Sequence, residues 1–408
     1  MRGDYRKRFL EETVFDPVFG RQMRFVIGPR QCGKTTMARE KLAEGKMPEL
    51  YFNWDSAEVK RKYRREGSLI PKTRAAEKKW VCFDEIHKMP KWKNVLKGIF
   101  DTREDEYNFI VTGSARLDIL RKAGDSLAGR YFVFRLSPFI LAEMTQNRTE
   151  YLRPESNPLD FVHKNLPEKK GAQKHMESLI MHGGFPEPLF KGEERFSRMW
   201  NEEYFERIIR EDMRDLSAVH YLEKAVDLAK ILPGKVGAPL SVESLVRDLE
   251  INHRTVKRYL KHLGLNFLIF ELCPYVNTVK ARRLNKKMTK VYFYNYSVIQ
   301  DEAARFENYI AVELKARVDL WNSGGAGKFD LYYIRNREKK ETDFLITNND
   351  RPYLLLEAKI SGVPVESHHR YFSGALGGIP FVQLVKKKVD VREDAGRFFT
   401  APASRFFG

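Results

Sequence analysis

The chain has 408 residues, and its 73 lysines and arginines against 55 aspartates and glutamates give a formal net charge of +18. This length predicts about two to four domains, because domains usually run to roughly 100–200 residues. The composition, 42% hydrophobic and 31% charged, excludes bulk disorder. No window approaches the roughly 18–20 apolar residues of a membrane span, and the charged first residues are atypical of a secretory signal. We therefore expect a cytoplasmic protein with no membrane partner.

The basic excess is uneven along the chain. Residues 1–150 have a net charge of +10, 151–240 of −1, 241–300 of +7 and 301–408 of +2. The sixty residues of 241–300 are the most basic for their length, which favours a polyanionic partner there. The three cysteines, Cys32, Cys82 and Cys273, form no close motif, so we expect neither a disulfide framework nor a cysteine-based zinc site.

Short apolar runs in the first third of the chain alternate with polar, helix-compatible stretches. The runs lie at residues 24–27, 50–53, 80–83, 108–111 and 131–135. This alternation is typical of α/β proteins with a mostly parallel sheet.

A phosphate-binding loop follows the first of these runs. Residues 28–35 read GPRQCGKT and match G-x-x-x-x-G-K-[ST], between the apolar RFVI and a helix-compatible segment. Backbone N–H groups of such a loop bind phosphates. We expect Lys34 to reach the β- and γ-phosphates and Thr35 to bind Mg²⁺. The loop residues expected to hold ATP are Gly28, Pro29, Arg30, Gln31, Cys32, Gly33, Lys34, Thr35 and Thr36.

Two later strands end in residues suited to phosphate chemistry. WVCFDEI ends in Asp84 and Glu85, and we expect Asp84 to hold Mg²⁺ and Glu85 to polarise the attacking water. NFIVTGSAR contains Thr112 and Ser114, one of which we expect to contact the γ-phosphate or the water. Simple capping of the strand end is the alternative for these two hydroxyls.

Four segments carry a resemblance to a known family: GPRQCGKTT, WVCFDEIHKMPKWKNVLKGIFD, NFIVTGSAR and LAGRYFVFRLSPFILAEM. They resemble the AAA+-type P-loop ATPases found mainly in archaea and bacteria, in which an uncharacterised region follows the ATPase. The resemblance spans nearly the whole chain and is compatible with a homo-oligomer. It implies that Arg130 acts near a phosphate, as a finger or a structural arginine, with Arg116 as the competing candidate. A surface or interstrand arginine is the alternative for both.

The most basic block reads as two helices with a tight break. The second, RTVKRYLKHLG, has an apolar face made by Val256, Tyr259, Leu260 and Leu263. Its basic residues recur at helical spacing on another face: Arg254, Lys257, Arg258 and Lys261. One face to pack and one basic face to present is what a helix-turn-helix recognition helix needs.

A basic segment, VKARRLNKKMTK, follows at 279–290 and suits a wing that touches phosphates. The resemblance agrees, because the family's C-terminal region usually opens with a winged-helix-like segment. We expect this module to bind double-stranded DNA, with further contacts from Arg282, Arg283, Lys286 and Lys287. A solvated basic face, or a wing used for packing and protein contacts, is the alternative.

A carboxylate-rich pair of strands lies near the C-terminus. Asp343 lies near the start of one strand, the turn TNNDRP follows, and the next strand carries Glu357-x-Lys359 with both side chains on one face. An upstream helical segment contains Glu313. This arrangement resembles the PD-(D/E)XK nuclease fold, although no proline precedes Asp343. The resemblance implies that Asp343 and Glu357 bind Mg²⁺ and that Lys359 orients or activates water. A nuclease fold without cleavage is the alternative.

The sequence therefore predicts an α/β protein of four parts: an AAA+-type P-loop ATPase domain at 1–150, a helical lid or linker at 151–235, a winged-helix-like module at 236–300 and a PD-(D/E)XK-like domain at 301–408. We expect a Mg²⁺-dependent ATPase in which ATP changes how the C-terminal region engages DNA. An ATP-controlled switch or interaction protein with an inactive nuclease fold, and a small-molecule kinase, are the alternatives. No histidine spacing typical of a metal site is evident, and we expect His368 and His369 in a surface loop.

Overall fold

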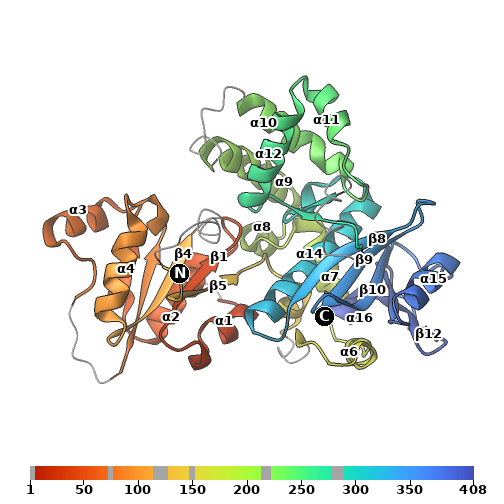
Figure 1. Cartoon of the computed structure of the whole chain (residues 1–408), viewed down its shortest axis with the longest axis horizontal. Helices are drawn as coiled ribbons and strands as arrows, with labels where there is room; N and C mark the ends of the chain where they lie inside the picture. The colour runs from red at the N-terminus through yellow and green to blue at the C-terminus, as the bar shows by residue number, and fades with distance from the viewer. Residues whose placement is uncertain (1–4, 72–76, 114–126, 147–151, 213–221, 277–288) are drawn as a thin grey trace. The chain divides into compact units, whose positions relative to one another are not determined.

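A computed structural model describes residues 5–71, 77–113, 127–146, 152–212, 222–276 and 289–408. Its contacts divide the chain into two compact units, Met1–Pro138 and Phe139–Gly408. Figure 1 labels many of the helices and strands, and we describe the two units one at a time. The finer boundaries expected at residues 150, 235 and 300 remain predictions.

The N-terminal unit is built on a five-stranded parallel sheet with strand order β2-β3-β4-β1-β5. The strands are β1 (Met23–Ile27), β2 (Tyr51–Asn53), β3 (Lys79–Asp84), β4 (Tyr107–Gly113) and β5 (Tyr131–Arg135). All five residues of β1 are buried, as expected for a central strand of a parallel sheet with both faces covered. The prediction of a parallel α/β sheet from the five apolar runs is confirmed.

Helix α1 (Phe9–Val14) precedes β1, and α2 (Lys34–Glu44), α3 (Ala57–Glu66) and α4 (Trp92–Arg103) connect β1 to β2, β2 to β3 and β3 to β4. Local chemistry sets their ends. The Ser56 hydroxyl accepts a hydrogen bond from the Val59 N–H at the start of α3, and Gly67 ends that helix in the left-handed region. Helix α2 begins directly after Gly33, so the loop 28–33 joins the carboxyl end of β1 to a helix N-terminus.

The second unit opens with helices α5 (Leu141–Thr145), α6 (Pro158–Asn165), α7 (Ala172–His182), α8 (Pro186–Lys191) and α9 (Glu194–Arg207). A short π-helical stretch at Ile208–Asp212 follows α9. Then come α10 (Leu222–Ile231), α11 (Val242–Leu249), α12 (His253–Leu265) and a two-stranded antiparallel sheet of β6 (Ile269–Leu272) and β7 (Lys290–Phe293). Helices α10, α11 and α12 contact one another, and α12 contacts β6.

The rest of this unit is a six-stranded sheet of order β12-β13-β11-β10-β9-β8 with helices packed on it. The strands are β8 (Phe329–Arg335), β9 (Glu341–Asn348), β10 (Arg351–Lys359), β11 (Phe381–Val385), β12 (Arg392–Asp394) and β13 (Phe398–Pro402). The helices are α14 (Glu302–Ser323), α15 (Ser367–Ala375) and α16 (Ala403–Phe407). Figure 1 shows α14 along the sheet, where it contacts β8 and β10.

Strands β8, β9 and β10 are antiparallel neighbours, and β11 then pairs parallel to β10. The crossover between β10 and β11 contains α15, as a parallel connection requires. An apolar cluster that includes Leu345, Leu355, Phe372 and Phe381 joins α15 to the sheet. This packing fixes the ends of β9 and β10, where the carboxylates predicted from the sequence lie.

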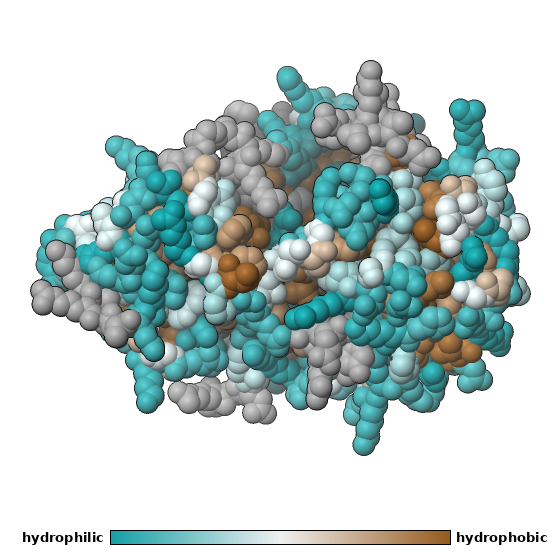
Figure 2. Space-filling model, turned by 60° about the horizontal axis from the view of Figure 1, so that its bottom comes forward, coloured by the Kyte–Doolittle hydropathy of each residue, from teal (hydrophilic) through white to brown (hydrophobic). Residues whose placement is uncertain are grey.

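The face drawn in Figure 2 is mainly hydrophilic, with brown apolar residues in separate small areas. Among the described residues, no helix combines the length and the apolar character needed to cross a membrane.

Candidate functional site

The loop 28–33 has a backbone that only glycine permits at two of its positions. Gly28 has φ 153°, and a Cβ built there would lie 2.1 Å from the Leu136 carbonyl oxygen. Gly33 has φ 105° and directly precedes α2. The Arg8 guanidinium donates a 2.9 Å hydrogen bond to the Cys32 carbonyl, which fixes the loop from outside. The loop is therefore a close-packed turn that leads directly into the N-terminus of α2, and helix N-termini with such loops bind phosphates.

Lys34 lies within this turn. Its side chain is buried, and Nζ donates to the carbonyl oxygens of Gly28 at 2.9 Å and Pro29 at 2.5 Å. The ammonium is thus held over the loop itself, where the motif predicts that it meets phosphate oxygens.

Asp84, at the end of β3, is the centre of the polar contacts beside the loop. One carboxylate oxygen accepts from the Thr35 hydroxyl at 2.8 Å and from the Tyr51 hydroxyl at 2.5 Å. The other accepts from the Thr112 hydroxyl at 2.5 Å. The structure therefore brings the predicted residues Thr35, Asp84 and Thr112 together, with Thr112 buried behind Asp84 rather than at the loop surface.

Tyr51 is a site residue that the sequence analysis missed. Burial and the hydrogen bond to Asp84 raise the pKa of its hydroxyl well above the usual range, so it acts only as a donor to the carboxylate. The Arg39 guanidinium lies 4.3 Å from the centre of the Tyr51 ring. A polar-tipped residue on β2, the strand next to β3, is the signal that could have identified it.

Glu85 takes a left-handed backbone conformation, with φ 52°, directly after β3. Its carboxylate lies 3.4 Å from Lys88 Nζ and 3.5 Å from His87 Nε2. Burial raises the pKa of Glu85, and the charge of Lys88 opposes that shift. A carboxylate with a raised pKa beside a phosphate-binding loop is a stronger proton acceptor than an ordinary glutamate.

The structure does not bring Arg130 to the loop. Arg130 precedes β5, whose first residue pairs with Met23 at the start of β1, whereas the loop follows the end of β1. Its guanidinium makes two hydrogen bonds to Asp101, of 2.7 and 3.1 Å. Arg130 therefore does not lie at this chain's own phosphate-binding loop, because a strand's length separates the two, and its role as a finger stays a prediction. Arg135, which pairs with Ile27, lies at the correct edge of the sheet.

The basic helix forms as predicted. Asn252 caps α12 by accepting the Thr255 N–H at 2.9 Å, and the four apolar residues predicted for its packed face are buried. The four predicted basic residues are all exposed: Arg254, Lys257, Arg258 and Lys261. The wing residues Arg282, Arg283, Lys286 and Lys287 lie outside the described residues, as does Arg116.

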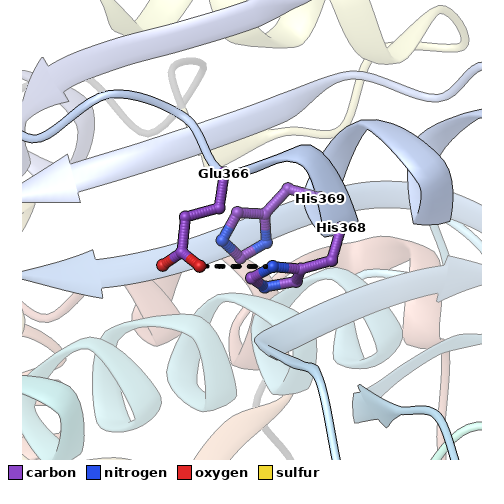
Figure 3. A group of neighbouring side chains, drawn as sticks. All are labelled: Glu366, His368 and His369. Carbon is purple, nitrogen blue, oxygen red and sulfur yellow. Dashed lines mark ion pairs between the residues drawn. The ribbon is translucent and has the colours of Figure 1, made fainter. Parts of the chain in front are cut away.

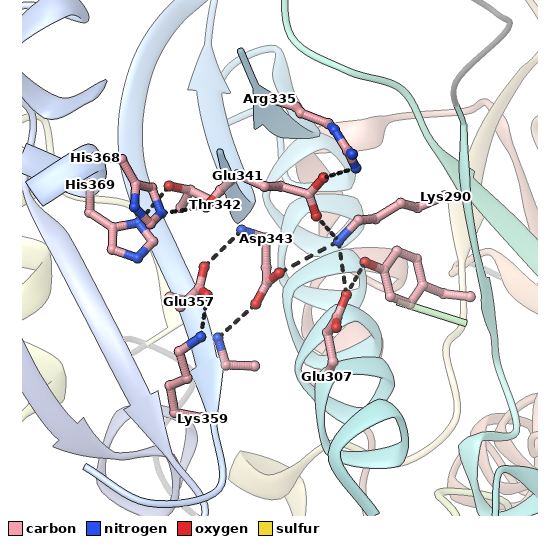
Figure 4. Close-up of polar contacts among 12 residues, drawn as sticks. Lys290, Glu307, Arg335, Glu341, Thr342, Asp343, Glu357, Lys359, His368 and His369 are labelled. Carbon is pink, nitrogen blue, oxygen red and sulfur yellow. Dashed lines mark hydrogen bonds and ion pairs between the residues drawn. The ribbon is translucent and has the colours of Figure 1, made fainter. Parts of the chain in front are cut away.

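In the C-terminal sheet, Asp343 and Glu357 are neighbours (Figure 4). The Asp343 N–H donates to Glu357 at 3.0 Å, Asp343 accepts the Ala358 N–H at 3.0 Å, and Lys359 Nζ lies 2.8 Å from Glu357. Burial raises the pKa of Glu357 to about 8, with a further contribution from Asp343. The three predicted residues Asp343, Glu357 and Lys359 are thus brought together.

Glu313 is not part of this group. Its carboxylate accepts the Leu141 N–H at 2.7 Å, and burial raises its pKa to about 8. The helical residue that faces Asp343 is Glu307, one and two-thirds turns earlier on α14 and therefore on a different face. Placing Glu313 among the nuclease residues was wrong for this reason.

Lys290, at the start of β7, was also missed, and it lies beside Asp343 among three carboxylates. It is fully buried, and its ammonium lies 2.6 Å from Glu341, 3.1 Å from Glu307 and 3.5 Å from Asp343. Burial disfavours its charge, but the carboxylates outweigh burial and raise its pKa. We call Lys290, Glu307, Glu341 and Asp343 the lysine–carboxylate cluster.

Figure 3 shows Glu366, His368 and His369 close together at the start of α15. Both ring nitrogens of His368 have partners, at 3.4 Å from Glu366 and 2.9 Å from the Glu341 carbonyl. His369 is 1% exposed, and its Nδ1 lies 2.8 Å from the Thr342 hydroxyl. The expectation of a surface loop for the two histidines is wrong, because α15 begins there and buries His369.

Comparisons with known proteins agree with a P-loop domain in the N-terminal unit. A family model described as an AAA domain matches residues 20–145, and one described as a domain of unknown function matches residues 173–305. An uncharacterized protein of Mycobacterium tuberculosis is 21% identical over 80% of this chain and 68% of its own length. One of Methanocaldococcus jannaschii is 28% identical over 66% of this chain and 60% of its own.

Among solved structures, the S. cerevisiae Hsp104–ADP complex matches with a TM-score of 0.29 and 11% identity, over 77% of this chain and 44% of that chain. The AAA assignment rests on the family model and on the loop, strands and Asp84 described above. The N-terminal region is an AAA-type P-loop domain.

Proposed function

We propose that this chain, whose N-terminal region is an AAA-type P-loop domain, hydrolyses ATP with Mg²⁺ and binds double-stranded DNA through the basic face of α12. The observation that carries the ATPase proposal is the meeting of Thr35 and Asp84 beside a loop that holds Lys34. Glu85 follows Asp84 directly and supports turnover rather than nucleotide binding alone.

The residues present fit ATP and Mg²⁺. Hydroxyl and carboxylate oxygens, as in Thr35 and Asp84, are the ligands that Mg²⁺ prefers. A Cβ at Gly28 would collide with the Leu136 carbonyl, so only glycine lets the loop keep this conformation. When bound, Mg²⁺ neutralises charge on the phosphates. Lys34 exchanges its two loop carbonyls for phosphate oxygens, Tyr51 and Thr112 hold the Asp84 carboxylate in place, and Glu85 accepts a proton from water.

The DNA proposal is supported by the second unit. Four exposed basic side chains share one helix that packs on α10 and α11 through its opposite face. Lysine and arginine on a helix face that is free to enter a groove are the usual phosphate and base contacts. The strongly basic composition of 241–300 supports the same assignment.

The test of the ATPase is the Lys34→Ala variant. Removing the ammonium should lower the rate of ATP hydrolysis by at least about 100-fold, since one preorganised charge donor is typically worth that much. A matched control is Lys41→Ala, which removes a lysine on the same helix from a surface pair with Glu44. Hydrolysis by Lys34→Ala at the wild-type rate would place turnover elsewhere.

We propose that the C-terminal domain has a nuclease-like fold but does not cleave DNA. Asp343, Glu357 and Lys359 converge as in a metal-dependent nuclease, which favours the fold. The ion pair between Asp343 and Lys290 favours an inactive state. Wild-type protein incubated with DNA and Mg²⁺ or Mn²⁺ should leave the DNA intact, and so should Asp343→Ala. Cleavage that disappears in Asp343→Ala would instead establish a nuclease.

A further inference from the structure

The lysine–carboxylate cluster contains an ammonium group where three carboxylates converge. Figure 4 shows the side chains of Glu307, Glu341 and Asp343 pointing at Lys290 Nζ. The N–O distances are 3.1, 2.6 and 3.5 Å in that order. Lys290 has no exposed surface. A buried charge persists when its partners are this close, because transfer from water is otherwise very costly.

Each carboxylate is held in this orientation by a further donor. Arg335 donates to the second oxygen of Glu341 at 3.0 Å, and the Ala358 N–H donates to the second oxygen of Asp343 at 3.0 Å. The Tyr292 hydroxyl donates to Glu307 at 2.7 Å. Oxygens that face Nζ are therefore fixed by the fold and do not depend on the lysine alone.

The three oxygens lie at distances from Nζ that suit an ammonium group. Mg²⁺ needs oxygens at about 2.0–2.1 Å in a near-octahedral shell, and the observed contacts have the lengths of N–H···O ion pairs. A divalent ion bound to the Asp343 carboxylate would also lie close to the Lys290 ammonium, and two like charges so close in a poorly hydrated interior repel strongly. The expected Mg²⁺ at Asp343 therefore does not fit while Lys290 is present.

Lys290 does not come from the C-terminal sheet. It begins β7, which pairs with β6, and it forms a bridge with Pro239, while the adjacent Thr289 carbonyl accepts the Leu240 N–H at 2.8 Å. These contacts connect the lysine to the segment that leads into α11. The cation of the cluster is thus supplied by the helical module that also carries the basic face of α12.

We propose that the Lys290 ammonium takes the place of a divalent metal ion in the lysine–carboxylate cluster, so that the C-terminal domain binds neither Mg²⁺ nor Mn²⁺ at Asp343 while β7 keeps its position. The proposal concerns only this cluster and rests on the nuclease-like assignment of Asp343 and Glu357, not on ATP hydrolysis or DNA binding. Replacing Lys290 with a neutral residue leaves carboxylates that recruit a divalent ion.

The test is a Mn²⁺ titration of the full chain without nucleotide or DNA, in which electron paramagnetic resonance measures the number of bound ions. Wild type and Asp343→Asn should bind equal numbers of Mn²⁺ ions. Lys290→Met should bind about one ion more than wild type, and Lys290→Met/Asp343→Asn should lose that ion. ATP hydrolysis by Lys290→Met should equal that of wild type, because the P-loop belongs to the other unit.

Two results would overturn the proposal. One is a wild-type Mn²⁺ site that Asp343→Asn removes, a comparison that does not involve Lys290 variants. The other is a folded Lys290→Met protein with no additional Mn²⁺. If circular dichroism shows that Lys290→Met does not fold, Lys290→Gln, which keeps hydrogen-bond donors, replaces it in the same titration. A failure of the ATPase proposal would leave all of these readouts unchanged.

Discussion

At the scale of single residues, Asp84 depends on its neighbours for its orientation. Three hydroxyls, from Thr35, Tyr51 and Thr112, donate to its two oxygens. Thr35 and Thr112 follow from the sequence motifs. Tyr51 does not, because it belongs to no motif and approaches Asp84 only through the pairing of β2 with β3.

The Tyr51→Phe variant tests this support. Loss of one hydrogen bond to a carboxylate should cost about 1 kcal/mol and lower kcat for ATP hydrolysis roughly fivefold. The KM for ATP should change little, since the Tyr51 hydroxyl acts through the Asp84 carboxylate. Tyr63→Phe is the control, because Tyr63 packs its ring on Trp54 in the same unit. Equal kcat in wild type and Tyr51→Phe would exclude a positioning role.

His369 links the C-terminal unit's stability to pH. Burial lowers its pKa to about 3, with His368 and Lys359 adding to the shift. The unfolded chain takes up this proton near pH 6.5, so between pH 6.5 and 3 the unfolded state binds more protons. The free energy of unfolding should therefore decrease as the pH is lowered from 6.5 to 3, by up to about 1.4 kcal/mol per pH unit.

Denaturant unfolding at pH 7, 6 and 5 measures this effect. His369→Gln should unfold more easily than wild type at pH 7 and should show a shallower dependence on pH. The control is His253→Gln, at an exposed position at the start of α12. An unchanged pH slope in His369→Gln would contradict the account.

Three residues show, for different physical reasons, how far the sequence predicts the sites. The place of Arg130 could have been predicted, because it precedes a strand parallel to β1, whereas Arg135 ends that strand at the edge where the loop begins. Lys290 could not have been predicted, since its contacts with Glu307 and Glu341 join distant segments that no local spacing relates. Glu313 lies between these cases: helical spacing places it and Glu307 on different faces, but not which of the two faces the sheet.

At the scale of elements, local pattern predicted the structure well. The apolar run at 80–83 became β3, Lys79–Asp84, and the split basic and apolar spacing became α12. Both elements are predicted by hydrophobic periodicity and capping residues, and these signals lie within the short segment itself. The order of strands in the two sheets depends on pairings between distant segments, and the sequence alone supplied none of it.

The basic face of α12 gives an element-scale prediction. Reversing Lys257, Arg258 and Lys261 to glutamate should weaken binding of double-stranded DNA at least tenfold. It should also flatten the plot of log K against log salt by roughly 0.9 for each phosphate that the variant no longer neutralises. Fluorescence anisotropy over a range of salt concentrations measures both quantities.

The matched control reverses Arg61, Arg64 and Arg65, three exposed residues of α3, and changes the net charge by the same amount. DNA affinity should change much less in that variant. Equal losses of affinity in the two variants would mean that net charge, rather than α12, carries the binding.

At the scale of the whole molecule, most of the net charge of +18 comes from two parts of the chain, and the two parts have different proposed roles. The block 241–300 holds the exposed face of α12, whereas the charge of the first 150 residues is spread over the P-loop unit. The two proposed activities lie in separate compact units. Coupling between them is therefore a property of the full chain and must be measured on it.

The rate of ATP hydrolysis with and without double-stranded DNA tests the central claim most directly. DNA should change kcat in wild type, the change should be absent when Lys257, Arg258 and Lys261 are reversed, and Lys34→Ala should be inactive in either condition. A wild-type rate that DNA leaves unchanged, although the protein is bound to it, would contradict the account and favour an ATP-controlled interaction protein.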